Sequence, residues 1–233
     1  MRTNLIRSAL FTIFFVCIFS RSHSVIADDR GCMTLELALQ EKRWQLPLVE
    51  GELTKGAVHD SIMGKNNRGL YQGVYQGADI VVKKVDLVYL GQSLKNAVAL
   101  NLISEIRFAF ELSNMGIAPK FFGVMRFSDG AYGIVTERIY PSWLARRVGH
   151  SSNQIPQALR AVNDSVKFKW VEKMNQIVRL ISSKKIRAHD LQFLLTPKGE
   201  VFVIDFGVYE RSDNVDVSVE NHANLSTIVS QIH

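Results

Sequence analysis

Hydrophobic residues follow a strand period in some segments and a helical period in others, and strands predominate in the first part of the chain while helices predominate in the second. Between residues 61 and 139, short runs rich in β-branched and aromatic residues alternate with glycine-containing turns, a pattern typical of antiparallel strands. The expected strand runs are Leu70-Tyr71, Val74-Tyr75, Ile80–Val82, Lys120–Phe127 and Ala131–Ile139. An apolar stripe with helical spacing covers residues 95–114, and Gly116 ends it. This part is therefore expected to be a sheet with one main helix.

The second part, from residue 140 onward, is expected to be richer in helix. Residues 165–182 carry apolar side chains at i, i+4, i+5 and i+8, which predicts an amphipathic helix. Two strand-like runs, 193–195 and 201–204, flank the turn Pro197-Lys198-Gly199, and residues 216–231 are expected to form a last helix. The mixture of an antiparallel sheet with separate helices predicts the α+β class.

The first 27 residues have the three-part layout of a secretory signal peptide. Arg2 and Arg7 precede an apolar run, Ala9–Ser20, and Val25-Ile26-Ala27 supplies the expected cleavage point. The apolar run is shorter than the about 20 residues that a membrane span needs, so we expect no stable span once the leader is removed. An uncleaved anchor is the alternative. The predicted location of the mature chain, which would start at Asp28, is outside the cell that makes it.

Composition excludes several classes of protein and partner. Of 233 residues, 47% are hydrophobic, with 15 Gly and 5 Pro, which excludes collagen-like and wholly disordered chains. The net charge is +6, but residues 1–27 contribute three Arg and no acid, leaving 25 basic and 22 acidic residues. That balance predicts no nucleic-acid partner, because such a partner needs a clustered basic face. Removal of Cys17 with the leader would leave Cys32 alone, without an intramolecular disulfide. We expect a monomer with one domain, or one split into two lobes.

Three features in the first part are candidates for binding a phosphate group. The segment Gly64–Gly69 precedes a strand run, and glycines there let backbone N–H groups approach a phosphate; an ordinary glycine-rich turn is the alternative. Lys83 ends an apolar run, where an ammonium is costly unless it is paired; a solvent-facing edge lysine is the alternative. Glu105, on the expected helix, could pair with Lys83, and Glu111 competes for that role.

Two carboxylates flank the expected hairpin of the second part. Asp190 lies just before the run 193–195, and Asp205-Phe206-Gly207 directly follows the run 201–204. One carboxylate can accept a proton from an attacking hydroxyl while the other binds a metal ion. Phosphoryl transfer needs this division, because its catalysis is mainly positioning and charge neutralisation by Mg²⁺. The sequence therefore predicts a phosphoryl-transfer site at this hairpin.

On these motifs, residues 62–207 resemble a protein kinase. The resemblance implies a minimal bilobal kinase-like fold, with an antiparallel-sheet N-lobe that carries one main helix and a truncated helical C-lobe. It also implies ATP, with Mg²⁺ or Mn²⁺, as cofactors. The implied positions are Gly64 and Gly69 in the phosphate-covering loop, Lys83 as the catalytic phosphate lysine, Glu105 as its helical partner, Glu137 and Ile139 in the adenine-receiving hinge, Asp190 as catalytic base and Asp205 as metal ligand.

The sequence departs from the kinase pattern in the catalytic loop. His189 stands where the family has arginine, and Leu195 stands five residues after Asp190, where the family has a metal-binding asparagine. Gln192, however, lies 13 residues before Asp205, which is the family's interval from that asparagine to its aspartate. The resemblance therefore implies a loop shortened by three residues, with Gln192 as the second metal ligand.

Within the kinases, the chain most resembles the minimal effector kinases of bacteria. Only 26 residues follow Gly207, too few for a long activation segment and a peptide-gripping helical subdomain, so activity is not expected to await phosphorylation. One such family is described as phosphorylating the ninety-kilodalton heat-shock chaperone inside host cells, which implies a protein substrate, here a host chaperone. The implied divisions are a signal peptide 1–27, an N-terminal extension 28–60, the kinase N-lobe and hinge 61–139, and a reduced C-lobe 140–233.

Three functions are therefore under consideration. The leading hypothesis is an ATP-dependent kinase that phosphorylates a Ser or Thr hydroxyl of a protein, as a secreted effector delivered to host cells. The first alternative keeps the fold but phosphorylates a small molecule, such as a sugar or an antibiotic. The second is a pseudokinase that acts as a binding module, a reading motivated by Gln192 in place of asparagine and by the incomplete glycine loop.

Overall fold

The first part of the chain forms a five-stranded antiparallel sheet, here called the sheet lobe. The computed structural model describes residues 45–46, 52–55, 67–85, 92–146, 159, 161–213 and 216–232; the expected signal peptide and Gly64 lie outside these ranges. The strands pair in the order β1-β2-β3-β5-β4, so β3 is the middle strand. Their bounds are β1 Thr54–Lys55, β2 Asn67–Tyr75, β3 Ala78–Val85, β4 Phe121–Arg126 and β5 Tyr132–Glu137.

The β2–β3 hairpin follows directly from its turn residues. Gln76 and Gly77 both have positive φ, 51° and 78°, as a two-residue turn that matches the twist of its strands requires. In β3, Ile80 and Val82 are fully buried because alternate side chains of a strand share one face. The buried residues of this small core are Ile80, Val82, Met125, Phe127, Ala131 and Val135.

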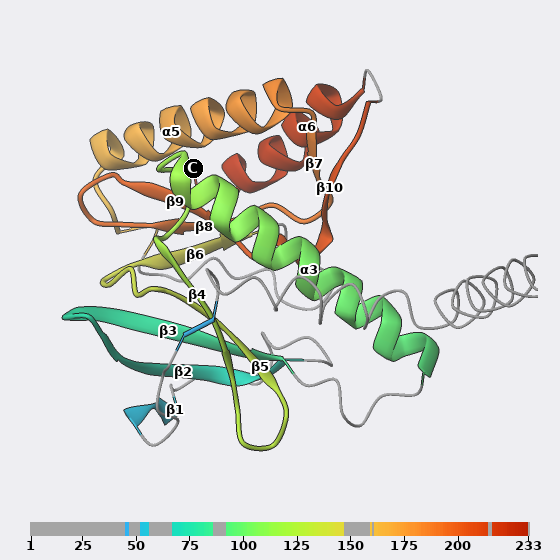
Figure 1. Cartoon of the computed structure of the whole chain (residues 1–233). Helices are drawn as coiled ribbons and strands as arrows, with labels where there is room; N and C mark the ends of the chain where they lie inside the picture. The colour runs from blue at the N-terminus through green and yellow to red at the C-terminus, as the bar shows by residue number, and fades with distance from the viewer. Residues whose placement is uncertain are drawn as a thin grey trace, which may run out of the picture.

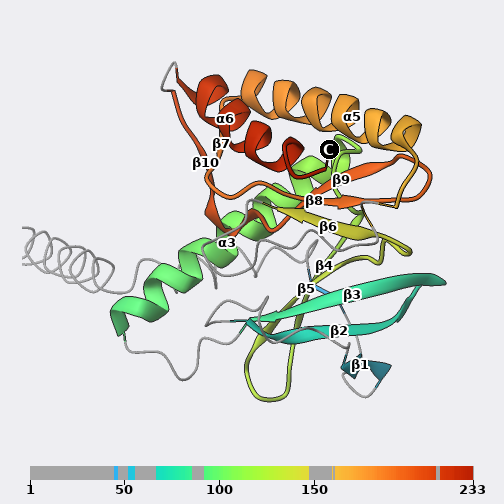
Figure 2. The ribbon, with the colours of Figure 1, turned by 180° about the vertical axis from the view of Figure 1, so that it is seen from behind.

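Helix α3, Gln92–Asn114, follows β3 in the chain and crosses between the sheet and the two C-terminal helices, as both views show (Figures 1 and 2). Phe108, Ala109 and Leu112 belong to the core of the second part of the chain. The Ser104 hydroxyl donates a hydrogen bond of 2.6 Å to the carbonyl of Tyr209, which also lies in that part. The C-terminal turns of α3 are therefore anchored on the second part of the molecule.

The second part, here called the helical lobe, packs two helices against short strands (Figure 1). Helix α5, Asp164–Ser183, begins where the Asn163 side chain accepts a hydrogen bond from the Ser165 N–H, and it buries one face that includes Trp170 and Met174. The strands pair as β6-β8-β9 and as β7-β10. The remaining bounds are β6 Trp143–Arg146, β7 Ile186–Ala188, β8 Gln192–Leu195, β9 Val201–Ile204, the 3-10 turn η4 Phe206–Val208, β10 Tyr209–Arg211 and α6 Val217–Val229.

Helix α6 is tied to β7 by two asparagine side chains. The fully buried Asn221 donates to the Ile186 carbonyl at 2.8 Å and accepts from the Ala188 N–H at 3.0 Å. Asn224 donates to the Ala188 carbonyl at 2.9 Å. These amides satisfy backbone groups of β7 that would otherwise be buried without partners. They therefore hold the strand that leads into Asp190.

The α+β class predicted from the sequence is confirmed, and so are the expected strands, hairpin turns and three helices. One expectation needs correction: Gly69 does not lie in a loop ahead of the strand, because β2 already begins at Asn67. The ladder has a bulge between these two residues, and Gly69 has a positive φ of 137°. No helix in the described part of the chain is long and apolar enough to cross a bilayer.

Candidate active site

Lys83 of β3 forms the centre of a charged cluster between the two lobes. Its Nζ lies 2.7 Å from Glu105 Oε1 on α3 and 2.7 Å from Asp205 Oδ1 after β9. Burial lowers the pKa of the Lys83 ammonium, but the charges and hydrogen bonds of Glu105 and Asp205 outweigh burial and raise it above its usual value. Lys83 is therefore a fixed positive charge held by two carboxylates.

The structure separates Lys83 and Glu105 from their competitors in the sequence. Lys84, next on the same strand, pairs with Asp129 at 2.6 Å and lies over the Phe127 ring. Glu111, two turns along α3, pairs with Arg211 at 2.6 Å. Each competitor is thus engaged away from the cluster, and Lys83 pairs with Glu105.

Glu105 is almost completely buried, with 8% of its surface exposed. Burial raises its pKa, the charge of Lys83 opposes that rise, and the charge of Asp205 adds to it. The charged form of the carboxylate therefore depends on the ammonium of Lys83, which opposes the effect of burial. This dependence makes the pair a unit.

Asp205 adopts a backbone conformation that is unusual for a residue other than glycine. Its φ and ψ are 61° and 68°, in the left-handed region, at the point where β9 ends and the turn η4 begins. The next residue, Phe206, is buried in the helical-lobe core. Its ring packs edge-on against the Tyr209 ring, with 5.5 Å between the ring centroids. Burial of Phe206 fixes the direction in which the Asp205 carboxylate points, which is toward Lys83.

Gln192 connects Asp205 to Asp190. Its Nε2 donates to Asp190 Oδ2 at 2.7 Å and to Asp205 Oδ2 at 3.0 Å. Gln192 begins β8 and pairs with Ile204 of β9, so both carboxylates flank the open end of one hairpin. A continuous network therefore runs from Glu105 through Lys83, Asp205 and Gln192 to Asp190.

This network contains the donor types that a magnesium ion takes. Two carboxylates and an amide supply hard oxygen atoms, and Asp190 and Asp205 already turn one oxygen each toward the same point. The amide nitrogen of Gln192, not its oxygen, faces that point, so ligation by Gln192 would require its amide to turn by about 180°. No group of three or more His, Cys, Asp or Glu that could hold a metal occurs in the residues the structure describes. The ion would depend on these three residues and on phosphate oxygens.

The remaining predicted positions lie on the strands beside β3 and just after β5. Gly69 is opposite Lys84 in the β2–β3 ladder. Glu137 ends β5, and its N–H donates to the Lys120 carbonyl at 2.8 Å. The Ile139 carbonyl accepts from the Ser142 hydroxyl at 2.7 Å. Among the described residues, the Ile139 N–H makes no backbone hydrogen bond.

Sequence reasoning missed Tyr209, which lies four residues after Asp205. The residue is buried, and its ring packs against Phe108 and Phe206. Its hydroxyl has no hydrogen-bond partner among the residues described. Burial and the charges of Asp190 and Asp205 raise the pKa of this hydroxyl, so it stays neutral beside the site. No local sequence pattern marks it.

A second missed feature is a surface cluster around His189. Glu210 Oε1 lies 3.1 Å from His189 Nε2 and 3.2 Å from an Arg187 nitrogen, and Arg187 Nε also lies 2.7 Å from Glu220. These hydrogen bonds lower the pKa of Glu210. The cluster joins the residues just before Asp190 to β10, the strand just after η4. It does so through the unmodified side chains alone, without a phosphorylated residue.

Comparison with known proteins adds little beyond this geometry. No protein-family model matches the chain, and no curated protein matches it. Among solved structures, a matching chain belongs to the CAK complex from Chaetomium thermophilum bound to ATP-γ-S, with a TM-score of 0.48 and 17% sequence identity. The match covers 70% of this chain and 49% of that one, so the chain spans about half the length of that protein.

The topology itself carries the fold assignment. An antiparallel five-stranded sheet, a helix between its β3 and β4, and a second lobe with a β8–β9 hairpin and helices occur in the order that the sequence resemblance implied. The chain therefore has an α+β fold whose elements are consistent with the minimal kinase-like fold that the resemblance implied.

Proposed function

We propose that the chain transfers the γ-phosphoryl group of ATP to a Ser or Thr hydroxyl of a protein. The observation that supports this most is the network from Glu105 to Asp190, in which one ammonium and three carboxylates from both lobes are joined by bonds of 2.7–3.0 Å. Phosphoryl transfer depends on positioning and charge neutralisation, and this cluster contains the charged groups that both tasks need.

Nucleotide binding would use the sheet lobe. The ammonium of Lys83, held by Glu105, would neutralise phosphate charge, and the N–H of Ile139 would donate to a nitrogen of the base. The C=O of Glu137 is the neighbouring acceptor. Gly69 lies across the ladder from Lys84, one position from Lys83, and its backbone would border the phosphate group.

Transfer would use the helical lobe. Asp190 would accept the proton of the attacking hydroxyl as the oxygen bonds to phosphorus, and the nucleoside diphosphate would leave with the electrons of the broken bond. Asp205 and Gln192 would hold a magnesium or manganese ion, which when bound neutralises phosphate charge. Lys83 would stay bound to Glu105 throughout, because Glu105 is buried and needs a positive partner.

The test is transfer of label from γ-labelled ATP by the full chain, with host-cell lysate as acceptor. Asp190→Asn and Asp205→Asn should each remove the labelled band, while Asp190→Asn still binds ATP. The matched control is Asp213→Asn, because Asp213 is an exposed carboxylate paired with Lys185 outside the network. Equal labelling by Asp190→Asn and by the wild type would overturn the proposal. Label only in small molecules would favour a sugar or antibiotic acceptor.

One observation favours a second candidate, a nucleotide-binding module without transfer. The amide nitrogen of Gln192 lies between the carboxylates of Asp190 and Asp205, where a cation would otherwise neutralise them. If that hydrogen bonding persists with nucleotide, no metal would be held there. ATP would then bind without any transfer, even at high Mg²⁺ or Mn²⁺. Activity gained by Gln192→Asn would show that the Gln192 amide keeps the metal ion out.

The biological setting that we propose is a secreted effector acting on a host protein. The leader pattern of residues 1–27 and the resemblance to minimal effector kinases support this setting. The purified ninety-kilodalton heat-shock chaperone is the first acceptor to test, with labelled ATP and the full chain. Mass spectrometry of protein recovered outside producing cells should find the N-terminus at Asp28; an intact Met1 there would contradict cleavage of the leader.

A further inference from the structure

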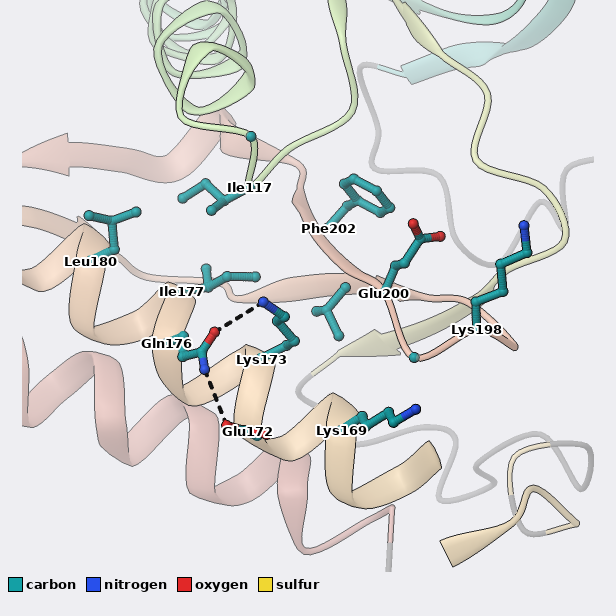
Figure 3. Close-up of a pocket in the computed structure, with 13 residues that line it drawn as sticks. Ile117, Lys169, Glu172, Lys173, Gln176, Ile177, Leu180, Lys198, Glu200 and Phe202 are labelled. Carbon is teal, nitrogen blue, oxygen red and sulfur yellow. Dashed lines mark hydrogen bonds between the residues drawn. The ribbon is translucent and has the colours of Figure 1, made fainter. Parts of the chain in front are cut away.

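A pocket far from the charged network lies at the turn end of the β8–β9 hairpin. Figure 3 shows it between helix α5, the connection from α3 to β4, and the hairpin turn. Its volume is about 680 Å³, within the range of about 300–1,000 Å³ that is usual for ligand pockets. Gln192 and Asp205 lie at the opposite, open end of the same hairpin, so this pocket is separate from the candidate active site. We call it the hairpin pocket.

The walls of the hairpin pocket are tied together by hydrogen bonds. The indole N–H of the buried Trp170 on α5 donates to the Thr196 carbonyl at 2.9 Å. The Gly199 N–H closes the hairpin turn on the same Thr196 carbonyl at 3.0 Å, and the Val203 N–H donates to the Ile117 carbonyl at 2.8 Å. A pocket whose three walls are joined in this way is already formed before a ligand arrives, which lowers the entropy cost of binding.

Aliphatic side chains gather at one end of the lining, beside Gln176 and Glu172, and lysines gather at the other, beside Glu200 and Phe202. Ile117, Ile177 and Leu180 lie at one end in Figure 3, while Lys169 and Lys198 lie at the other, with Lys173 between them. A ligand that fills this pocket therefore needs a large apolar group at one end and polar or charged groups along the rest.

The lining has a small excess of positive charge, with three lysines against two glutamates. The two carboxylates of the lining already accept hydrogen bonds, Glu172 from Gln176 at 3.4 Å and Glu200 from the Thr196 hydroxyl at 3.3 Å. Within the described residues, no ion pair holds any of the three lysines, and Lys173 donates only to the neutral Gln176 at 3.2 Å. The ammonium groups are thus exposed donors that form no ion pair with either glutamate of the lining, and three lysines against two glutamates leave a net charge of +1.

We propose that the hairpin pocket docks an acidic peptide segment of a protein partner, one that carries a large apolar side chain. The side chain would fill the aliphatic end, and the carboxylates would meet the lysines. A nucleic acid would engage the lysines but leave the aliphatic end uncovered, and inorganic phosphate would leave most of the volume empty. The proposal goes beyond the proposed function, because docking needs neither nucleotide nor metal.

The test is selection of a randomised peptide library, displayed on phage, by the immobilised full chain. Selected peptides should combine two or more acidic residues with a Leu, Ile or Phe. The charge-reversal variant Lys173→Glu/Lys198→Glu should bind a selected synthetic peptide about tenfold more weakly, and Leu180→Gln should also weaken it. The matched control is Arg126→Glu/Lys184→Glu, which makes the same change of charge at two exposed cations outside the pocket and should bind as the wild type does.

Several outcomes would overturn the proposal. These are no enrichment of peptides, enrichment without acidic residues, or equal loss of binding in the control variant. Displacement of the peptide by an oligonucleotide with similar affinity would identify a nucleic-acid surface instead, and displacement by inorganic phosphate alone would identify an anion site. Thermal unfolding at the wild-type temperature shows that a variant is folded. ATP hydrolysis by Lys173→Glu/Lys198→Glu should equal that of the wild type, so loss of docking and failure of the proposed phosphotransfer remain distinguishable.

Discussion

The two lobes contribute unequally to the candidate active site. The sheet lobe supplies one charged side chain of the network, Lys83, from the middle strand of a sheet with a small core. The helical lobe supplies Asp190, Gln192 and Asp205 from one hairpin that is embedded in a much larger core. Three acidic or amide groups are therefore placed by one rigid unit, and the single cation is placed by the other.

Helix α3, although it follows a strand of the sheet, belongs with the helical lobe in this respect. In addition to the Ser104 hydrogen bond, Glu111 pairs with Arg211 at 2.6 Å, and the ring centroids of Phe108 and Tyr209 lie 5.9 Å apart. Glu105 is thus held by the same unit as Asp205. Among the salt bridges of the described residues, the two that Lys83 makes are the ones that join the sheet to this unit. The geometry of the site therefore depends on Lys83.

The largest expected effect is therefore that of Lys83→Met. Phosphoryl transfer should fall about 10²–10³-fold, because the phosphate charge loses its partner and the buried carboxylate of Glu105 loses its ammonium. The measurement is the rate of label transfer from γ-labelled ATP, with circular dichroism to show that the variant is folded. Lys84→Met is the matched control: it removes the next lysine of the same strand, which pairs with Asp129, and should keep wild-type turnover. Equal losses in both variants would show that the sheet, not the network, had been damaged.

A smaller effect tests how the helical lobe holds its hairpin. Asn221→Ala removes three side-chain hydrogen bonds and leaves the Ala188 N–H and the Ile186 carbonyl buried without partners. The free energy of unfolding should fall by about 2–3 kcal/mol, measured by urea denaturation. Asn224 is half-buried, so Asn224→Ala should lower the free energy of unfolding by about 1 kcal/mol or less. An Asn221→Ala variant as stable as the wild type would mean that α6 does not support β7.

Much of the fold could be predicted because its periodic signals are strong. The stripe that predicted residues 95–114 and the amphipathic pattern of 165–182 correspond to α3 and α5, and the turn chemistry at Gln76-Gly77 located the first hairpin. The short strands β6, β7 and β10 were not predicted, because none of them borders a hairpin turn like the one at Pro197-Lys198-Gly199 that marked the equally short β8 and β9. Their pairing depends on contacts between residues far apart in the chain.

The candidate site divides in the same way. Lys83 and the two aspartates could be selected because each is a charged residue beside an apolar strand run, where a charge needs a partner. The role of Gln192 as a bridge between carboxylates could not be foreseen, since spacing alone pointed to a metal ligand and says nothing of which amide atom faces inward. Tyr209 could not be selected either, because only the fold brings its hydroxyl beside two carboxylates.

The smallest expected effect concerns the sheet lobe alone. The Asp129 carboxylate accepts hydrogen bonds from Lys84 and from the Ala131 N–H, and these lower its pKa below the usual 3.8. A lowered pKa means that the unfolded chain takes up the proton first, so the contribution of Asp129 to stability is present above about pH 4 and is lost as the pH falls through the folded pKa. Asp129→Asn should therefore lower the free energy of unfolding at neutral pH but not in strong acid.

Because half of the Asp129 side chain is exposed and Lys84 keeps its contact with the Phe127 ring at 4.2 Å, the loss should be about 1 kcal/mol or less. Urea denaturation at several pH values measures this loss. A loss that is equal at pH 7 and pH 2, or one that is accompanied by reduced transfer from ATP, would contradict the prediction. It would mean that this turn is coupled to the network and that the two lobes are less separate than their cores indicate.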